Sequence, residues 1–416
     1  MRSKRRSTRL LLLAPLAFSL GLALGRTTAA GQEGWKTYWK NGTRIESEDG
    51  RFAIKIGGRI QADFSFADPD PVIDSAFEVE DGTELRRARL FVEGTIYERF
   101  EFKAQYDFTG GDAAPKDVYV GLVDLPVVGG LRIGHFKEPF SLEELTSSKY
   151  LPFLERSYPV EAFSPSRNMG LMLHDSIAGD RVTWAAGVFK DADDFAESTG
   201  GEWNVTVRLT GLPVADDSGG TLLHLGLGVS ARSPADDTTR FRARPQAHLA
   251  PRLVDTGSLA TEDVDLLGLE AAVVRGPFWA QSEWIQASTS EPADVAGWYV
   301  QAGWFLTGET RPYKRSEGVF DRLTPESDFL AGGGAGAWEI ALRYGSLDLI
   351  DREVVVPPLD AGVDGGGIDG GEQDGVGVAL NWYLNSASRM MLDWVTTDVE
   401  SSGSVDFLLL RLQVDF

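Results

Sequence analysis

Residues 403–416, at the end of the chain, read GSVDFLLLRLQVDF. Counted back from the last residue, one set of alternate positions is apolar throughout: Phe416, Val414, Leu412, Leu410 and Leu408. The other set is mostly polar and comprises Asp415, Gln413, Arg411, Leu409 and Phe407. Successive side chains of a β-strand point to opposite faces of a sheet, so this stretch predicts a strand with one apolar face and one mostly polar face.

The same alternation recurs along most of the chain, with clear examples at residues 52–66, 100–108 and 203–209. It predicts sixteen strands, an even number. They span residues 52–66, 84–96, 99–108, 117–124, 130–136, 168–177, 181–190, 202–211, 220–232, 263–275, 277–289, 296–307, 336–350, 374–385, 388–399 and 403–416.

A secreted β-sandwich would alternate too, so the pattern alone leaves two fold classes open. Three features favour a membrane barrel: the length of the strands, the aromatic residues near their ends, and the terminal Phe416, which resembles the C-terminal signature of outer-membrane barrels. We therefore predict an all-β fold, a sixteen-stranded antiparallel transmembrane β-barrel. Barrels of this size enclose an aqueous lumen. Phe416 is the expected assembly signal, read by the barrel-assembly machinery.

The connections predict which end of the barrel faces which side. Short ones such as Tyr97-Glu98 and Ser386-Ala387 fall at one end, which we expect to be periplasmic. Three connections are long: 137–167, which contains a predicted helical turn over Ser141–Leu145, 233–262, and 308–335. The last falls at the short-turn end, so it either hides two strands or folds inward. An inward-folded segment would constrict the lumen.

The N-terminus predicts export. A basic segment precedes the apolar run 10–24, and Thr28-Ala29-Ala30 offers small residues for cleavage before Gly31. The run is shorter than the roughly 20 residues of a membrane-spanning helix, and no later run is longer. We expect three regions: a signal peptide over 1–30, a short periplasmic segment over 31–50, and an outer-membrane barrel over 51–416.

Composition excludes several functional classes. There are 40 Lys and Arg against 62 Asp and Glu, a net charge of −22, which argues against a nucleic-acid binder. The chain has no Cys, and its four His residues are far apart, so neither a metal site nor a cofactor is expected. His174-Asp175-Ser176 is the one compact group of triad residue types. Neighbours on a strand point to opposite faces, so no enzyme is predicted.

The strands also predict the charge of the lumen. If the apolar faces contact lipid, seven bases face inward, because a cation facing lipid at mid-bilayer costs roughly 2–4 kcal/mol. These pore-lining bases are Lys55, Arg59, Arg87, Arg89, Lys103, Arg132 and Arg208. Rings of cations favour anions in a pore. The inward acids Asp63, Glu93, Glu101 and Asp107 offer an alternative, in which the charges pair across neighbouring strands.

Several segments resemble the phosphate-selective porin family. The longest is Arg132–Ser148, and shorter ones are Leu85–Leu90, Phe153–Ser157 and Arg411–Phe416. The resemblance implies a trimeric sixteen-stranded channel for phosphate or polyphosphate with inward-folded constriction loops. This chain departs from many members in lacking length for a helical N-terminal extension, and its acidic total leaves a general or cation-preferring diffusion porin as the alternative.

The resemblance also implies site residues. Lys137 and Lys149 would frame the narrowest point, with Asp107 nearby, and anions would approach through a basic cluster in the second long connection, formed by Arg240, Arg242 and Arg244. Acids concentrate in other connections, for example at 68–81 and 191–197. They either solvate exposed loops or bind lipopolysaccharide through divalent cations.

Overall fold

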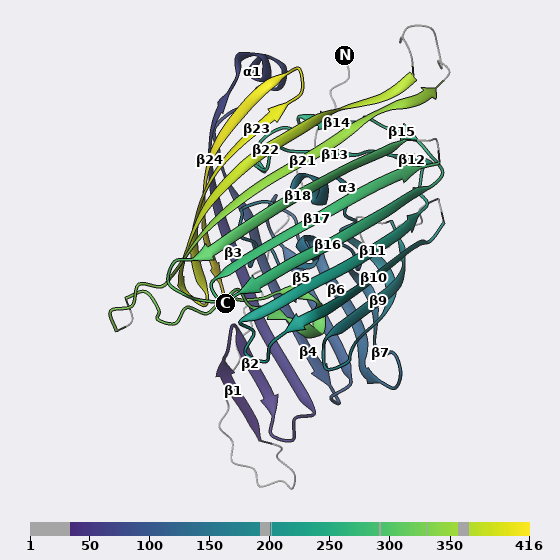
Figure 1. Cartoon of the computed structure of the whole chain (residues 1–416). Helices are drawn as coiled ribbons and strands as arrows, with labels where there is room; N and C mark the ends of the chain where they lie inside the picture. The colour runs from purple at the N-terminus through teal and green to yellow at the C-terminus, as the bar shows by residue number, and fades with distance from the viewer. Residues whose placement is uncertain (1–33, 192–199, 201, 291–292, 331, 357–365) are drawn as a thin grey trace, which may run out of the picture.

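The structure is a computed structural model that describes residues 34–191, 200, 202–290, 293–330, 332–356 and 366–416. The predicted signal peptide therefore lies outside the described residues. In the described part, the main sheet has 18 strands. Two of them, β1 (Trp35–Trp39) and β2 (Thr43–Ser47), form a hairpin within the segment expected to be periplasmic. The other sixteen form one antiparallel barrel, which closes where β24 pairs with β3 (Figure 1).

The first nine barrel strands are β3 (Phe52–Pro69), β4 (Gly82–Ile96), β5 (Phe100–Asp107), β6 (Ala114–Leu125), β7 (Gly129–Lys137), β8 (Arg167–Ile177), β9 (Val182–Lys190), β10 (Asn204–Ala215) and β11 (Thr221–Arg232). The remaining seven are β16 (Val264–Arg275), β17 (Phe278–Thr289), β18 (Asp294–Phe305), β21 (Ala337–Val356), β22 (Gly366–Asn385), β23 (Ser388–Val399) and β24 (Gly403–Asp415). The predicted fold class and strand count are confirmed.

The alternation in the sequence matches the two faces of the wall. In β16, burial alternates residue by residue, with inward Leu266 4% exposed and outward Leu269 49% exposed. The three apolar residues on the inner face of β24, Val405, Phe407 and Leu409, are buried in a core that includes Ile73 of α1 (Pro71–Phe77). Among the described residues, no helix is long and apolar enough to cross a membrane.

Predicted strand bounds agree with the structure to within four residues, except at the β21–β22 hairpin. The predicted strands 336–350 and 374–385 leave Asp369 and Glu372 in the connection between them, but both residues belong to β22. The reason is backbone pairing: Ile350 of β21 pairs with Asp369, so the ladder continues beyond the apolar part of the strands.

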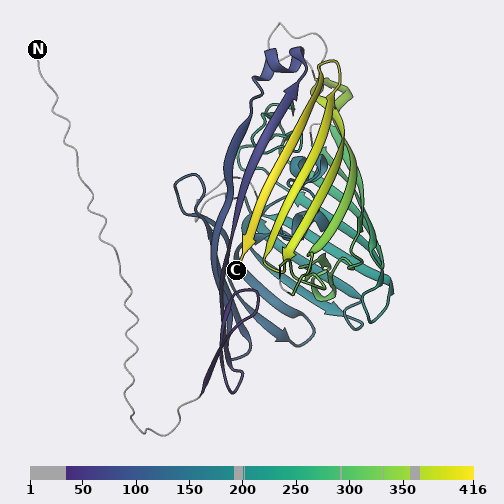
Figure 2. The ribbon, with the colours of Figure 1, turned by 90° about the vertical axis from the view of Figure 1, so that its left-hand side faces the viewer.

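Three long connections fold at least in part into the barrel, and Figure 2 shows helical turns between its walls. The constriction segment, residues 138–166, contains α2 (Leu142–Leu145) and α3 (Tyr158–Phe163). The mouth loop, residues 233–262, contains β12 (Thr238–Thr239), β13 (Arg242–Ala243), β14 (Val254–Asp255) and β15 (Leu259–Ala260). The inward turn, residues 306–336, contains β19 (Tyr313–Lys314), η1 (Arg315–Glu317) and β20 (Val319–Phe320).

The inward turn decides between the two predicted alternatives. Among its described residues, the only strands are β19 and β20. They form a separate hairpin and add no strand to the barrel wall, so the hidden-strand alternative is wrong. Val319, Phe320 and Leu323 are buried in one cluster with Leu142 and Phe153 of the constriction segment. Apolar burial therefore holds the part of the turn around residues 319–323 inside the lumen.

Candidate functional site

The constriction segment is anchored to β17 and β21 of the barrel wall by buried polar groups. The Glu283 carboxylate on β17 accepts hydrogen bonds from the backbone N–H groups of Leu142 and Glu143, at 3.0 and 2.8 Å. Arg343 on β21 donates to Glu143 at 2.6 Å, and both side chains are fully buried. The predicted helical turn is α2, whose N-cap Ser141 accepts a bond from the Glu144 N–H.

The structure places the two constriction lysines against carboxylates. Lys137, the last residue of β7, forms an ion pair with Glu144 at 3.0 Å. Lys149, in the constriction segment, pairs with Asp415 of β24 at 3.4 Å. Asp107 pairs with Arg89 at 2.7 Å and accepts a bond from Thr109. Each of the three side chains is therefore already partly neutralised or hydrogen-bonded by the protein.

Five of the seven predicted pore-lining bases pair with acids, as the alternative of cross-strand pairing predicts. Glu93 forms ion pairs with Lys55 at 3.2 Å and with Lys103 at 3.1 Å. The other three pairs are Arg89–Asp107 at 2.7 Å, Arg132–Glu101 at 3.1 Å, and Arg208–Glu270 at 2.7 Å. A sixth base, Arg87, donates to Gln61 and lies 4.0 Å from Glu155.

Arg59 and Lys116 have no carboxylate partner within 4.0 Å among the described residues, and the buried Arg311 and Arg389 have none either. Arg59 donates only to the Ser148 hydroxyl, at 2.7 Å. Lys116 of β6 interacts electrostatically with Arg89 and Arg167, and with the carboxylate of Asp107, which is already paired with Arg89. Arg167 itself pairs with Asp117 at 2.7 Å. Arg59 and Lys116 therefore leave uncompensated positive charge on this side of the lumen, which favours anions over cations.

A cavity of about 640 Å³ lies beside this cluster. Lys103, Asp117, Arg132 and Lys137 line it from the wall, and Glu317 lines it from the inward turn. It is large enough to hold several hydrated ions. His174, Asp175 and Ser176 also line it, but no hydrogen bond joins His174 to either neighbour, so within the described residues no relay forms.

The three bases of the predicted mouth cluster differ in their pairing. Arg240 makes a bidentate ion pair with Asp255, both contacts at 2.6 Å, and its side chain is 47% exposed. Arg244 pairs with Glu161 of α3 at 3.1 Å. Arg242 has no ion pair in the described part of the chain. A second cavity, of about 370 Å³, lies beside Arg240.

Phe416 lies at the seam of the barrel. Its N–H donates to the Gly58 carbonyl at 3.1 Å, and its carbonyl accepts from the Gly58 N–H at 2.7 Å. A Cβ at the neighbouring Gly57 would lie 2.4 Å from the Phe416 carbonyl oxygen, so only glycine allows this approach. The ring is 36% exposed and belongs to the outward face.

Reasoning from sequence missed Lys116 and the anchors of the constriction segment. Lys116 lies within a register shift, where Ala104 and Tyr106 of the neighbouring β5 pair with Val118 and Pro115, so counting alternate residues does not predict its face. Arg343 and Glu283 stand on the inward face of their strands, but alternation does not say what an inward side chain contacts. The described residues contain no group of three or more His, Cys, Asp or Glu side chains suited to a metal ion.

Comparison with known proteins agrees with this geometry. The chain is 28% identical to Porin O of Pseudomonas aeruginosa, with 91% of each chain covered. It is 31% identical to an uncharacterized protein of Caulobacter vibrioides, covering 91% of this chain and 76% of that one.

Solved porin structures share the fold. An anion-selective porin from Comamonas acidovorans has a TM-score of 0.54 at 12% identity and covers 88% of this chain and all of its own. The trimer form of OmpT from Vibrio cholerae has a TM-score of 0.53 at 10% identity, covering 88% of this chain and 99% of its own. The family described as phosphate-selective porin O and P matches residues 54–416, and the chain belongs to that family.

Proposed function

We propose that the lumen conducts small anions by passive diffusion and prefers phosphate or polyphosphate. The observation that carries this proposal is the uncompensated charge of Arg59 and Lys116 beside the constriction segment. As a member of its porin family, the protein lies in the outer membrane, and its family and fold are those of a channel rather than an enzyme. The family's description and the similarity to Porin O support the phosphate preference.

The chemistry of the cluster suits phosphate better than chloride. A guanidinium presents N–H donors in a planar fork that matches two phosphate oxygens, and an ammonium adds three donors. Arg59 is 7% exposed, so it is only weakly screened by water. Arg89, Arg167 and Lys137 are each paired with an acid. They offer further N–H donors to an anion but add less net positive charge than Arg59 and Lys116. Binding shared among several such groups stays weak enough for release, as conduction requires.

A general or cation-preferring porin is the competing function. The pairing of five lumenal bases with acids favours it, because a neutralised lumen selects little by charge. The acidic total of the chain favours it as well. The two proposals differ in the sign of ion selectivity, which a bilayer recording measures.

The proposal also covers the export, orientation and assembly of the channel. Residues 1–30 direct export and are removed, and the hairpin β1–β2 lies in the periplasm beside the short turns. Phe416 guides insertion by the barrel-assembly machinery, and three copies form a homotrimer. The acidic loops at the other end face lipopolysaccharide. The trimer form of OmpT and the shared porin fold support the homotrimer.

Block of chloride current by phosphate in planar bilayers tests the proposed function. Wild-type channels should lose part of their chloride current when phosphate is added, and the double variant Arg59→Gln, Lys116→Gln should lose much of this block. The control replaces one Arg and one Lys away from the lumen, Arg275→Gln with Lys36→Gln, both of which are exposed. Equal block in the wild type, the double variant and the control would contradict the proposal.

A further inference from the structure

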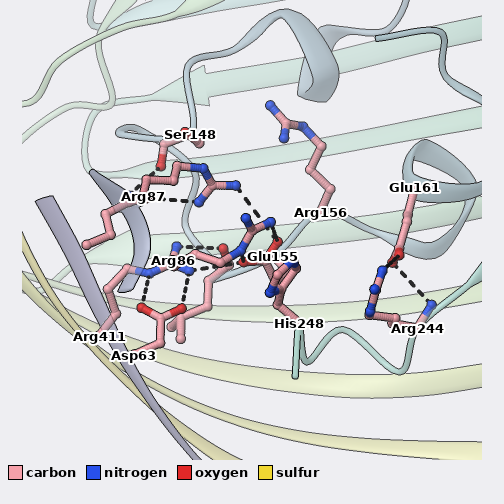
Figure 3. A network of polar contacts seen from close by, with 12 residues as sticks. Asp63, Arg86, Arg87, Ser148, Glu155, Arg156, Glu161, Arg244, His248 and Arg411 are labelled. Carbon is pink, nitrogen blue, oxygen red and sulfur yellow. Dashed lines mark hydrogen bonds and ion pairs between the residues drawn. The ribbon is translucent and has the colours of Figure 1, made fainter. Parts of the chain in front are cut away.

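Three segments that lie far apart in the sequence meet around one carboxylate. They are Leu85–Leu90 of β4, Phe153–Ser157 of the constriction segment, and Arg411–Phe416 at the end of the chain. Glu155 lies between Arg86 and Arg411, as Figure 3 shows. We name this group of three residues the clamp.

The clamp is tight and largely buried. Arg86 donates two parallel hydrogen bonds to Glu155, from Nε at 2.8 Å and from Nη2 at 2.9 Å. Arg411, which is fully buried, donates to the same carboxylate at 3.0 Å. Burial raises the pKa of Glu155, but Arg86, Arg87 and Arg411 outweigh it and hold this pKa well below its ordinary value. Glu155 is therefore ionised, which makes each contact a charge-assisted hydrogen bond.

The clamp residue Arg411 also forms a hydrogen bond with the backbone of the constriction segment. Arg411 Nη1 donates to the carbonyl of Leu154 at 2.7 Å, and the N–H of Leu154 donates to Asp393 of β23 at 2.7 Å. In the same segment, the Ser148 hydroxyl accepts a hydrogen bond from Arg59, which has no carboxylate partner within 4.0 Å among the described residues. Glu155 therefore helps to fix the position of the segment beside β3 and β4. That position in turn places Ser148 next to Arg59.

We propose that Glu155 is a positioning residue for selectivity: the clamp fixes how far the constriction segment stands from the β3–β4 wall, and so sets the width and charge of the passage. This inference rests on the proposed anion conduction. Glu155 does not contact the permeating ion. It acts by holding the segment, while its negative charge by itself works against anion passage.

The two roles of Glu155 predict opposite changes in the chloride-to-potassium permeability ratio, so a substitution can distinguish them. Glu155→Gln removes a negative charge beside the lumen, so a purely electrostatic role predicts a higher chloride-to-potassium permeability ratio. A positioning role predicts a several-fold lower ratio, because the segment moves and the passage widens. It also predicts larger single-channel conductance and greater open-channel current noise.

Arg86→Gln removes the opposite charge from the same contact. Loss of the clamp should again raise conductance and noise, although the charge change has the reverse sign. Glu80→Gln is the control, because it removes an exposed carboxylate in the loop before β4. Recordings in planar bilayers compare the three variants with the wild type after heat-dependent gel mobility has shown that each barrel is folded.

The outcomes separate the alternatives. A lower permeability ratio with raised noise in Glu155→Gln supports the clamp, and a higher ratio with wild-type noise overturns it. If Glu155→Gln does not fold, Arg86→Gln decides: raised noise and conductance support the clamp, and wild-type values overturn it. A wild-type channel that prefers cations would defeat the proposed anion conduction, while conductance and noise would still test the clamp.

Discussion

Arg411 and Asp63 face each other across the seam that closes the barrel, although 348 positions separate them in the sequence. Arg411 Nε lies 2.7 Å from Asp63 Oδ1, and a second contact joins the other pair of atoms. The same guanidinium reaches Glu155 and the Leu154 carbonyl. One side chain therefore joins the first barrel strand, the last barrel strand and the constriction segment.

This relationship predicts a large loss of stability for Arg411→Met. Removing one partner of a buried ion pair leaves an uncompensated charge and costs about 3–5 kcal/mol. Urea unfolding in lipid vesicles, followed by tryptophan fluorescence, measures the change. Ser65→Ala is the control, because Ser65 is buried on β3, the strand that carries Asp63, and its hydroxyl has no hydrogen-bond partner among the described residues. A loss in Arg411→Met no larger than that of the control would contradict the prediction.

Deleting Phe416 should sharply lower the amount of folded protein in the outer membrane. The deletion removes both backbone hydrogen bonds to Gly58 as well as the outward ring. Phe100→Ala also removes an exposed aromatic ring from the short-turn end, 55% exposed, and should have little effect. Fractionation and heat-dependent gel mobility give the amounts, and normal levels of the truncated chain would count against an assembly role.

Among the mouth-cluster bases, Arg242→Ala should reduce chloride conductance at low salt more than Arg240→Ala, because Asp255 already neutralises Arg240. The triple replacement of Arg240, Arg242 and Arg244 should have the largest effect. All three effects should fade at high salt, since the Debye length falls from about 10 Å at 0.1 M to about 3 Å at 1 M. A loss that is independent of salt would instead indicate a collapsed mouth loop.

Anion preference should weaken as pH rises from about 6 to about 8, because neutral Lys149 attracts anions less than its charged form. Burial lowers the pKa of Lys149 to about 7, although Asp415 of β24 opposes this; Arg59 and Arg322 lower it further. Below this pKa the ammonium is charged. Potassium chloride is the salt to use, because phosphate itself titrates in this range. Lys149→Gln should flatten the pH profile, and an unchanged slope in that variant would refute the assignment.

Sequence predicts the wall of this barrel well and the contents of its lumen poorly. Alternation is a local property, so it identified β24 and the inward face that carries Arg59 and Arg87. It failed at Lys116, where a register shift in the ladder with β5 changes the count. It also could not pair Glu155 with Arg411, 256 positions away, because that contact exists only once the barrel has closed.

For the inward turn, too, the sequence predicted the position in the chain but not the packing. Its length and its place at the short-turn end indicated an unusual connection, but two hidden strands remained possible from the sequence. The burial of Phe320 against the constriction segment decides the matter, and this packing depends on both segments being inside one barrel.

The reversal potential of the wild-type channel in a potassium chloride gradient tests the central claim most directly. Uncompensated charge at Arg59 and Lys116 predicts a reversal potential displaced toward the chloride equilibrium potential at neutral pH. A displacement toward the potassium equilibrium potential would contradict anion conduction, and with it the proposed preference for phosphate.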